Sequence, residues 1–176
     1  YQPDGIWSKV GGEAYKYVVS PGSEQHRRGI YVVLKRGAPY PSFINFDASA
    51  RLACTVKRSR TNTPLQALTL LNDPVYVEAA KSLALRVLSE HTTADSAEQL
   101  GYAFQLCTAR TPSPHELGIL ADLLETQRSI GLNDHAAITT LANGTDLPDG
   151  VDSAEFSAWC SVATTLLNLH ETITKD

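Results

Sequence analysis

Three short motifs that begin helices constrain the fold of this chain more than any other feature of its sequence. They read Thr63-Pro64-Leu65-Gln66, Ser96-Ala97-Glu98-Gln99 and Ser113-Pro114-His115-Glu116. Each has Ser or Thr followed three residues later by Gln or Glu. This is the pattern of a capping box, in which the two side chains satisfy backbone N–H groups at a helix start. Proline takes the first helical position in two of the three, where its missing N–H does no harm. Together the motifs predict a mainly α-helical protein.

The helix after Thr63 carries apolar residues on nearly every side. They are Leu65, Ala67, Leu68, Leu70 and Leu71. A helix that is apolar all round belongs inside a core, so we expect these leucines to be buried. Asn72-Asp73-Pro74 then ends this helix and begins another, with Asp73 as the cap and Pro74 at the first position. The two helices should therefore form a sharp corner.

Apolar residues at helical spacing predict the remaining helices. These cover residues 74–90, 96–109, 113–128 and 153–170, with a short helix at 135–141. Ser153 is the expected cap of the last long helix, with Glu155 close behind it. The chain reads as a mainly α, irregular helical domain of about five to six helices, with an extended, loop-rich N-terminal arm. We expect a single domain over residues 1–176. Its parts are a loop-rich basic part at 1–62, a helical core at 63–128, a loop or insertion at 129–151 and a final helix at 152–172.

Two apolar stretches of the N-terminal part are ambiguous. Tyr15–Ser20 is short and rich in aromatic and β-branched residues, which suits a strand or an extended arm. Ile30–Leu34 is a continuous apolar run, and periodicity does not separate a buried strand from a buried helix there. Propensity favours a strand, whereas the family resemblance given below favours a helix.

Charge is distributed unevenly along the chain. Residues 1–90 hold 12 of the 15 Lys and Arg and 7 of the 19 Asp and Glu, a net charge of +5, so the remainder carries −9. Such a division suggests either two lobes that attract each other or a basic face for an anionic partner. Nucleic acid is a poor candidate for that partner, because the chain is acidic overall, with a pI of about 5.7 and few aromatic residues.

The cysteines and histidines form no metal or haem motif. Cys54, Cys107 and Cys160 are far apart, and the five histidines are dispersed without a zinc-binding spacing. We expect the cysteines to be small buried residues, with at most one disulfide among them. We expect no metal and no cofactor in this chain.

Four arginines are the candidates for an anion or ligand site. Arg27, Arg28, Arg58 and Arg60 present planar guanidinium groups that suit phosphate, sulfate or carboxylate. The alternative is that they pair with Asp47 or with helix ends and hold a loop in place. A hydrolase that uses Asp47 is a further alternative, which requires a second carboxylate or a histidine at reacting distance. The sequence contains no G-x-S-x-G nucleophile motif, and a Ser or Cys nucleophile stays an open alternative because catalytic triads assemble in space.

A series of motifs resembles a known family. They are His26-Arg27-Arg28-Gly29-Ile30-Tyr31, Pro39 with Pro41, Phe46-Asp47-Ala48, Cys54, Arg58 with Arg60, Asn62-Thr63-Pro64-Leu65-Gln66-Ala67-Leu68 and Leu71-Asn72-Asp73-Pro74. In this order they resemble a planctomycete domain of unknown function, the C-terminal module of large proteins that often carry cytochrome-c-like domains. Trp159 and the stretch Leu166–Glu171 resemble the last helix of that domain, although Thr172 stands where the family usually has Phe.

The resemblance implies a setting and a parent protein, without an activity. The chain has no Met, so we expect it to be part of a larger protein. The resemblance implies an extracytoplasmic location, in the periplasm or at the cell surface, with haem in other domains of the parent. It also implies a role linked to polysaccharide use or electron transfer. We expect the other domains of the parent, and an anionic glycan, as partners. No apolar run approaches the roughly 20 residues that a membrane span needs.

Overall fold

The computed structural model describes residues 18–35, 37–49, 53–54, 56–92, 95–131 and 135–174. This part of the chain is mainly α-helical and contains no strand, and six of its helices have eight or more residues. The predicted fold class is confirmed. Residues 15–17 of the ambiguous Tyr15–Ser20 stretch lie outside the described residues, and 18–20 have no regular structure. The chain divides into two compact units, residues 1–66 and 67–176. Whether both belong to a single domain stays a prediction.

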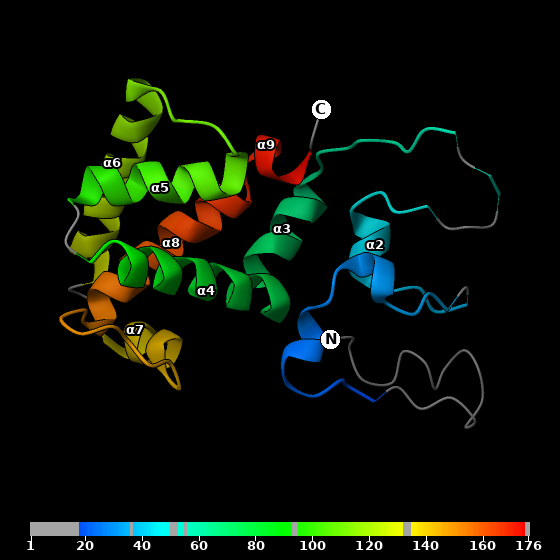
Figure 1. Ribbon diagram of the computed structural model, residues 1–176, viewed down its shortest axis with the longest axis horizontal. Helices are drawn as coiled ribbons and strands as arrows, with labels where there is room; N and C mark the ends of the chain where they lie inside the picture. Colours follow the sequence, from blue (N-terminus) through cyan, green and yellow to red (C-terminus); the bar gives the residue numbers. More distant parts are fainter. Residues whose placement is uncertain are drawn as a thin grey trace. The chain divides into compact units, whose positions relative to one another are not determined.

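The first unit contains only short helices in its described part. They are the 3-10 helices η1 (Gly22–His26) and η2 (Gly29–Tyr31) and the α-helix α2 (Pro41–Asn45), seen in Figure 1. The helix that the family resemblance favours over Ile30–Leu34 is wrong, because the helical turn ends at Tyr31 and Val32 has extended backbone. The loop-rich part expected at residues 1–62 is interrupted by α2, in which Pro41 takes the first position.

Helix α3 (Pro64–Asn72) begins as predicted and buries less than predicted. The Gln66 N–H donates to Thr63 Oγ1 at 3.3 Å, and the Thr63 N–H donates to Gln66 Oε1 at 2.9 Å, which confirms the capping box. Leu65, Leu68 and Leu71 are 62%, 56% and 48% exposed, so the expectation of a fully buried helix is wrong. The buried face of this helix is the one that carries Gln66 and Leu70, which lie four residues apart. These two residues are 1% and 7% exposed.

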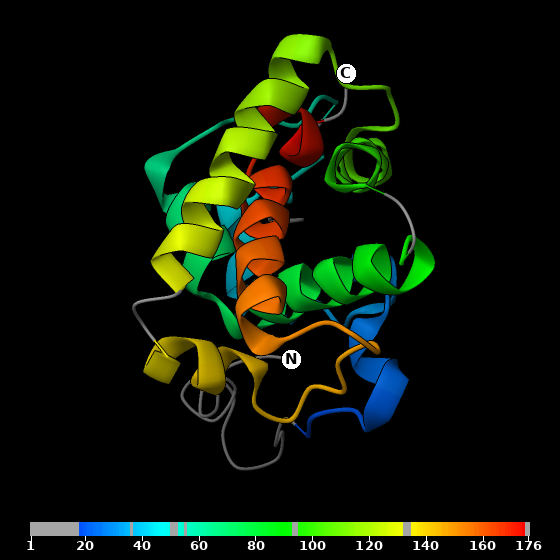
Figure 2. The same ribbon diagram turned by 90° about the vertical axis from the view of Figure 1, so that its left-hand side faces the viewer.

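The second unit is built around α8 (Ser153–Leu167). This helix is contacted by α4 (Pro74–Glu90), α5 (Ser96–Thr108), α6 (Pro114–Gly131), α7 (His135–Ala142) and α9 (His170–Ile173). Figure 2 shows α6 and α8 side by side along their length. A helix with neighbours on so many sides must be apolar on most of its surface, and seven of its residues are buried.

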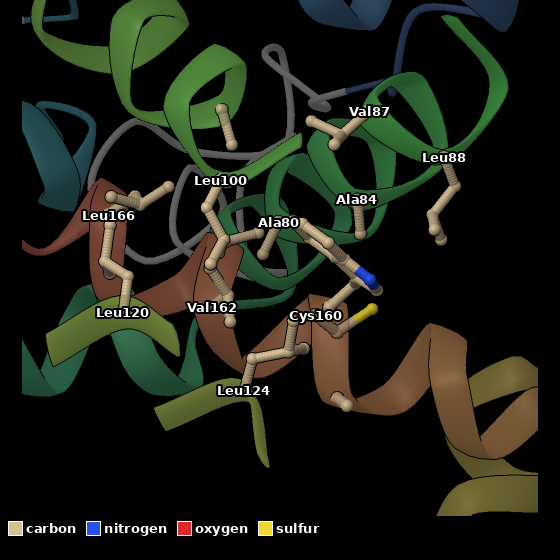
Figure 3. Packing of buried hydrophobic residues seen from close by; sticks show 14 of the residues in the cluster. Ala80, Ala84, Val87, Leu88, Leu100, Leu120, Leu124, Cys160, Val162 and Leu166 are labelled. Carbon is tan, nitrogen blue, oxygen red and sulfur yellow. The ribbon is translucent and has the colours of Figure 1, made fainter. Parts of the chain in front are cut away.

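The core of the second unit is formed where α8 meets its neighbours. Figure 3 shows Val162 and Leu166 of α8 among Leu100, Leu120 and Leu124 of α5 and α6. Small residues of α4, Ala80 and Ala84, allow that helix to approach closely. The largest fully buried side chains of this unit are Trp159 and Phe156.

The helix starts of the second unit follow the capping rules, with two shifts of one residue. Asp73 accepts from the Val75 N–H at 3.0 Å and Ser113 forms its predicted capping box, so both predictions are confirmed. The caps expected at Ser96 and Ser153 are wrong. Asp95 and Asp152, each one residue earlier, accept the N–H bond at 2.8 Å instead. Both carboxylates also lie near the positive end of their helix dipole.

Two other boundaries differ from the prediction. The last helix does not run through to His170. It ends at Leu167, and the short α9 begins at His170 after Leu169 adopts extended backbone. The stretch 129–151 is less irregular than expected, because α6 continues to Gly131 and the predicted short helix is present as α7.

Candidate functional site

Asp47 joins the end of α2 to the loop that precedes α3. Its backbone is left-handed, with φ of 58°, a conformation that Asp tolerates better than most residues. One carboxylate oxygen, Oδ2, accepts from the Thr61 backbone N–H and from Thr61 Oγ1, both at 2.7 Å. The other, Oδ1, accepts from Ser59 Oγ at 3.4 Å. Three donors from residues 59–61 therefore hold this carboxylate.

Gln66 completes the same network from the first turn of α3. It is 1% exposed, and its Nε2 donates to the Asn45 carbonyl at 2.8 Å and to Thr61 Oγ1 at 3.0 Å. Its Oε1 accepts from the Thr63 N–H at 2.9 Å. Thr61 Oγ1 thus accepts from Gln66 and donates to Asp47, which links the two side chains. We call Asn45, Asp47, Thr61, Thr63 and Gln66 the polar corner.

These contacts favour the ionised form of Asp47. The pKa of its carboxyl is lowered first by the hydrogen bonds from Thr61, with smaller contributions from Ser59 and from the charge of Arg58. Arg58 Nε also donates to the backbone carbonyl of Asp47 at 3.2 Å. The predicted pairing of Arg58 with Asp47 is therefore made at the carbonyl oxygen, by an exposed arginine.

The four candidate arginines have different surroundings. Arg27 forms an exposed ion pair with Glu24, and Arg28 Nη2 donates to the Tyr31 hydroxyl at 3.3 Å. Arg58 lies at the polar corner, and Arg60, exposed on the same loop, has interactions of its own. The contacts of the described residues do not bring the four into one site, and that they bind an anion stays a prediction.

Most of the remaining motif residues lie at the ends of helices. Pro64 and Pro74 begin α3 and α4, and Asn72 Nδ2 donates to the Leu68 carbonyl at 2.8 Å near the end of α3. Asn62 is exposed in the loop before α3.

The cysteines differ from the expectation that all three are buried. Cys54 is exposed, because it lies in the loop between α2 and α3, while Cys107 is partly buried and Cys160 is buried. All three are free thiols. In the described ranges no three His, Cys, Asp or Glu side chains gather to hold a metal ion. None of the helices described is long and apolar enough to cross a membrane.

Comparison with family models identifies the chain over most of its length. Residues 2–124 match the model described as PSD1, protein of unknown function (DUF1553). The chain belongs to the PSD1 family. The matched residues include the whole polar corner and end within α6. The resemblance noted around Trp159 lies beyond the match and stays a prediction. No curated protein and no solved structure was found to match.

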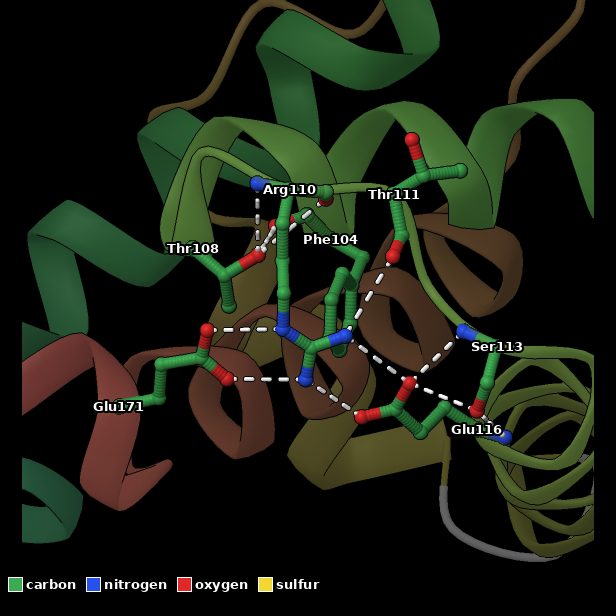
Figure 4. Close-up of polar contacts among 7 residues, drawn as sticks. All are labelled: Phe104, Thr108, Arg110, Thr111, Ser113, Glu116 and Glu171. Atoms are coloured by element: carbon green, nitrogen blue, oxygen red, sulfur yellow. Dashed lines mark hydrogen bonds and ion pairs between the residues drawn. The ribbon is translucent and has the colours of Figure 1, made fainter.

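The chain also contains an arginine cluster in its second unit that the sequence analysis did not predict. Arg110 lies between two glutamates and over a ring, as Figure 4 shows. Its Nε and Nη2 donate to Glu171 at 2.8 and 2.9 Å, and its Nη2 and Nη1 donate to Glu116 at 2.6 and 3.1 Å. Its guanidinium carbon is 4.7 Å from the centre of the Phe104 ring.

The cluster joins three elements of the second unit. Glu116 also accepts from the Ser113 N–H at 2.7 Å, so the capping box of α6 and the Arg110 pair use the same carboxylate. These bonds, that from Arg110 first, lower the pKa of Glu116 to about 2. The capping motif predicted the Ser113 contact, but nothing local could reveal Glu171, which is 61 positions from Arg110.

A second missed cluster lies between α6 and α8. Arg128 Nε donates to Glu155 at 2.8 Å, and Glu155 in turn accepts from Trp159 Nε1 at 2.9 Å. The indole N–H of the largest buried side chain is thereby satisfied. A third joins α4 to α5, where the Tyr102 hydroxyl donates to Glu90. These contacts fit a structural role, since each one joins two helices or gives a buried polar group a hydrogen-bond partner.

Proposed function

We propose that this chain is a non-catalytic accessory or interaction domain of a large extracytoplasmic protein that also carries cytochrome-c-like domains. In this proposal any haem is held by other domains of the parent, and the chain binds those domains. The observation that supports it is that the polar side chains of the motif bind one another. Asp47, Thr61 and Gln66 form hydrogen bonds with each other and with the backbone. Such a network shapes a surface and leaves little capacity for chemistry.

The state of Asp47 supports this over a hydrolase. A general acid needs a raised pKa near the working pH, whereas the pKa of Asp47 is lowered. A carboxylate nucleophile or base needs access to the reacting atom, but both oxygens of Asp47 accept from Ser59 or Thr61. Its partners in the described part of the chain are hydroxyl, amide and guanidinium groups, with neither a second carboxylate nor a histidine among them.

Two substitutions at Asp47 separate the structural role from a catalytic one. Asn keeps an acceptor for Thr61 and tolerates left-handed backbone, so Asp47→Asn should leave residues 45–66 folded. Asp47→Ala and Thr61→Val each remove contacts of the corner and should accelerate hydrogen exchange in that stretch. The measurement is peptide-level hydrogen exchange, together with whatever activity the parent protein shows.

The outcomes are distinct. If the corner is structural, any function of the parent survives in Asp47→Asn and falls in Asp47→Ala and Thr61→Val alike. Loss of function in Asp47→Asn with unchanged hydrogen exchange, and normal function in Thr61→Val, would make Asp47 a catalytic group and defeat the proposal.

A binding module for anionic polysaccharide is the second candidate, and charge favours it. Residues 1–66 contain 10 Lys and Arg against 4 Asp and Glu, a net charge of +6. Lys57, Arg58 and Arg60 are exposed on the loop that Asp47 holds. A loop that is fixed in place loses less conformational entropy when it binds a polyanion.

Thermal-shift measurements with sulfated and uronic polysaccharides at low and high salt test this candidate. A rise in melting temperature that salt removes, and that Arg58→Gln reduces, would support it. Arg86→Gln is the matched control, because Arg86 is an exposed arginine of the acidic second unit. An equal rise in both variants would show non-specific attraction. If the polysaccharides cause no rise, the accessory role is the candidate that remains.

A further inference from the structure

One segment of the first unit exposes large apolar side chains in close succession. Ile30, Tyr31 and Val33 are 77%, 64% and 68% exposed, all within four residues. Scattered exposed apolar residues are ordinary, whereas a contiguous set indicates contact with an apolar partner.

The same segment is basic. Arg27 and Arg28 precede the apolar residues and Lys35 and Arg36 follow them, and no acidic residue occurs between Glu24 and Asp47. The guanidinium carbon of Arg28 lies 5.5 Å from the centre of the Tyr31 ring, and its Nη2 donates to the Tyr31 hydroxyl. Arg28 therefore places a cation beside the apolar side chains of this segment, while Arg27 is paired with Glu24.

The segment is held by its contact with α2. A Cβ atom on Gly29 would lie 3.0 Å from the Phe43 ring, closer than side chains normally approach, so any larger residue would have to displace that ring. Phe43 itself packs edge-on against Tyr40, with ring centres 5.1 Å apart. The turn at Gly29–Tyr31 is thus fixed at its base while its apolar side chains point into solvent.

We propose that residues 26–35 are a peripheral binding site for the surface of a bilayer that contains anionic phospholipid. Ile30 and Val33 enter the boundary between headgroups and acyl chains, Tyr31 lies at the level of the headgroups, and Arg28 binds lipid phosphate. Aliphatic side chains on an irregular segment match an apolar phase without fixed shape. A polysaccharide offers cations a partner, but it offers Ile30 and Val33 none.

This inference does not depend on the proposed function, because it uses different residues from the polar corner. It also requires no spanning helix, since interfacial binding needs only a few apolar side chains and complementary charge. A basic segment is attracted to an anionic leaflet before any side chain is inserted, which gives the two groups of residues separate, measurable contributions.

Vesicle cosedimentation of the whole 176-residue chain tests the proposal. The vesicles are pure phosphatidylcholine or a roughly 7:3 mixture of phosphatidylcholine and phosphatidylglycerol, whose charge resembles an anionic leaflet. The chain should bind the mixed vesicles and not the neutral ones. Ile30→Ser combined with Val33→Ser should weaken binding by about tenfold or more. Arg28→Gln should weaken it about fivefold.

Ile119→Ser is the matched control, because Ile119 is 55% exposed on α6 of the acidic second unit. Its binding should equal that of the unchanged chain. No binding to the anionic vesicles overturns the proposal. So does binding that the Ile30 and Val33 substitutions leave unchanged, since the attraction is then purely electrostatic. A soluble sulfated polysaccharide could instead compete with the vesicles for the chain while the serine variants bind as well as the unchanged chain does. That result would identify a glycan as the ligand, and it also overturns the proposal.

Discussion

Truncation of Gln66 should destabilise the first unit more than its size suggests. Gln66→Ala removes three hydrogen bonds from a side chain that is 1% exposed. The Asn45 carbonyl and the Thr63 N–H lose a partner, and Thr61 Oγ1 loses a donor. At about 1 kcal/mol for each net hydrogen bond, the free energy of unfolding of this region falls by about 3 kcal/mol. A decrease of that size corresponds to about 150-fold faster hydrogen exchange.

Thr63→Ala is the control, because it removes a single bond, that from the Gln66 N–H to Thr63 Oγ1. Loss of such a cap costs about 1 kcal/mol, or about fivefold in exchange. Hydrogen exchange of peptides covering residues 43–66 is the appropriate assay, because a chain of two units need not unfold in one step. If Gln66→Ala exchanges no faster than Thr63→Ala, the polar corner does not hold this region and the reasoning is refuted.

Three further predictions concern the core, an ion pair and the thiols. Phe156→Ala, at a fully buried position of α8, should destabilise the second unit by about 3–5 kcal/mol, measured by urea unfolding followed by tryptophan fluorescence. Because the pKa of Glu116 is lowered to about 2, its stabilising effect is complete above its ordinary value of 4.5. This stabilisation is lost as the pH falls from 4.5 toward 2. The free energy of unfolding of Arg110→Gln should therefore fall less over this pH range than that of the unchanged chain, as measured by unfolding at a series of acidic pH values. Cys54 should react with a thiol reagent at pH 8 without unfolding, whereas burial raises the pKa of Cys160 to about 12 and should keep that thiol unreactive until the chain unfolds.

Local features of the sequence predicted the helices well. The capping boxes at Thr63 and Ser113 and the cap at Asp73 are present because donor and acceptor lie within three residues of each other. The same rule placed two other caps one residue too late, since Asp95 and Asp152 offer a carboxylate just before Ser96 and Ser153. Such short-range bonds depend little on the rest of the fold.

The candidate site was predicted only in outline. One alternative from the sequence had the arginines pair with Asp47 and hold a loop in place, and Arg58 does donate to the Asp47 carbonyl. The hydrogen bonds that join Asp47, Thr61 and Gln66 were not predicted. The predictions that Cys54 and the whole of α3 are buried were wrong, because exposure depends on which neighbours are available and not on the polarity of a residue alone. That the arginines bind an anion remains a prediction.

The sequence by itself determined where helices begin, that the protein is mainly α-helical, and that its basic residues concentrate in the first part of the chain. Only the tertiary structure decided which helix is central, which leucines remain exposed and that Arg110 pairs with Glu171 across 61 positions. The physical reason is the range of the interactions. Helix caps join residues three or four apart, whereas core packing and ion pairs between helices join residues that only the folded chain brings together.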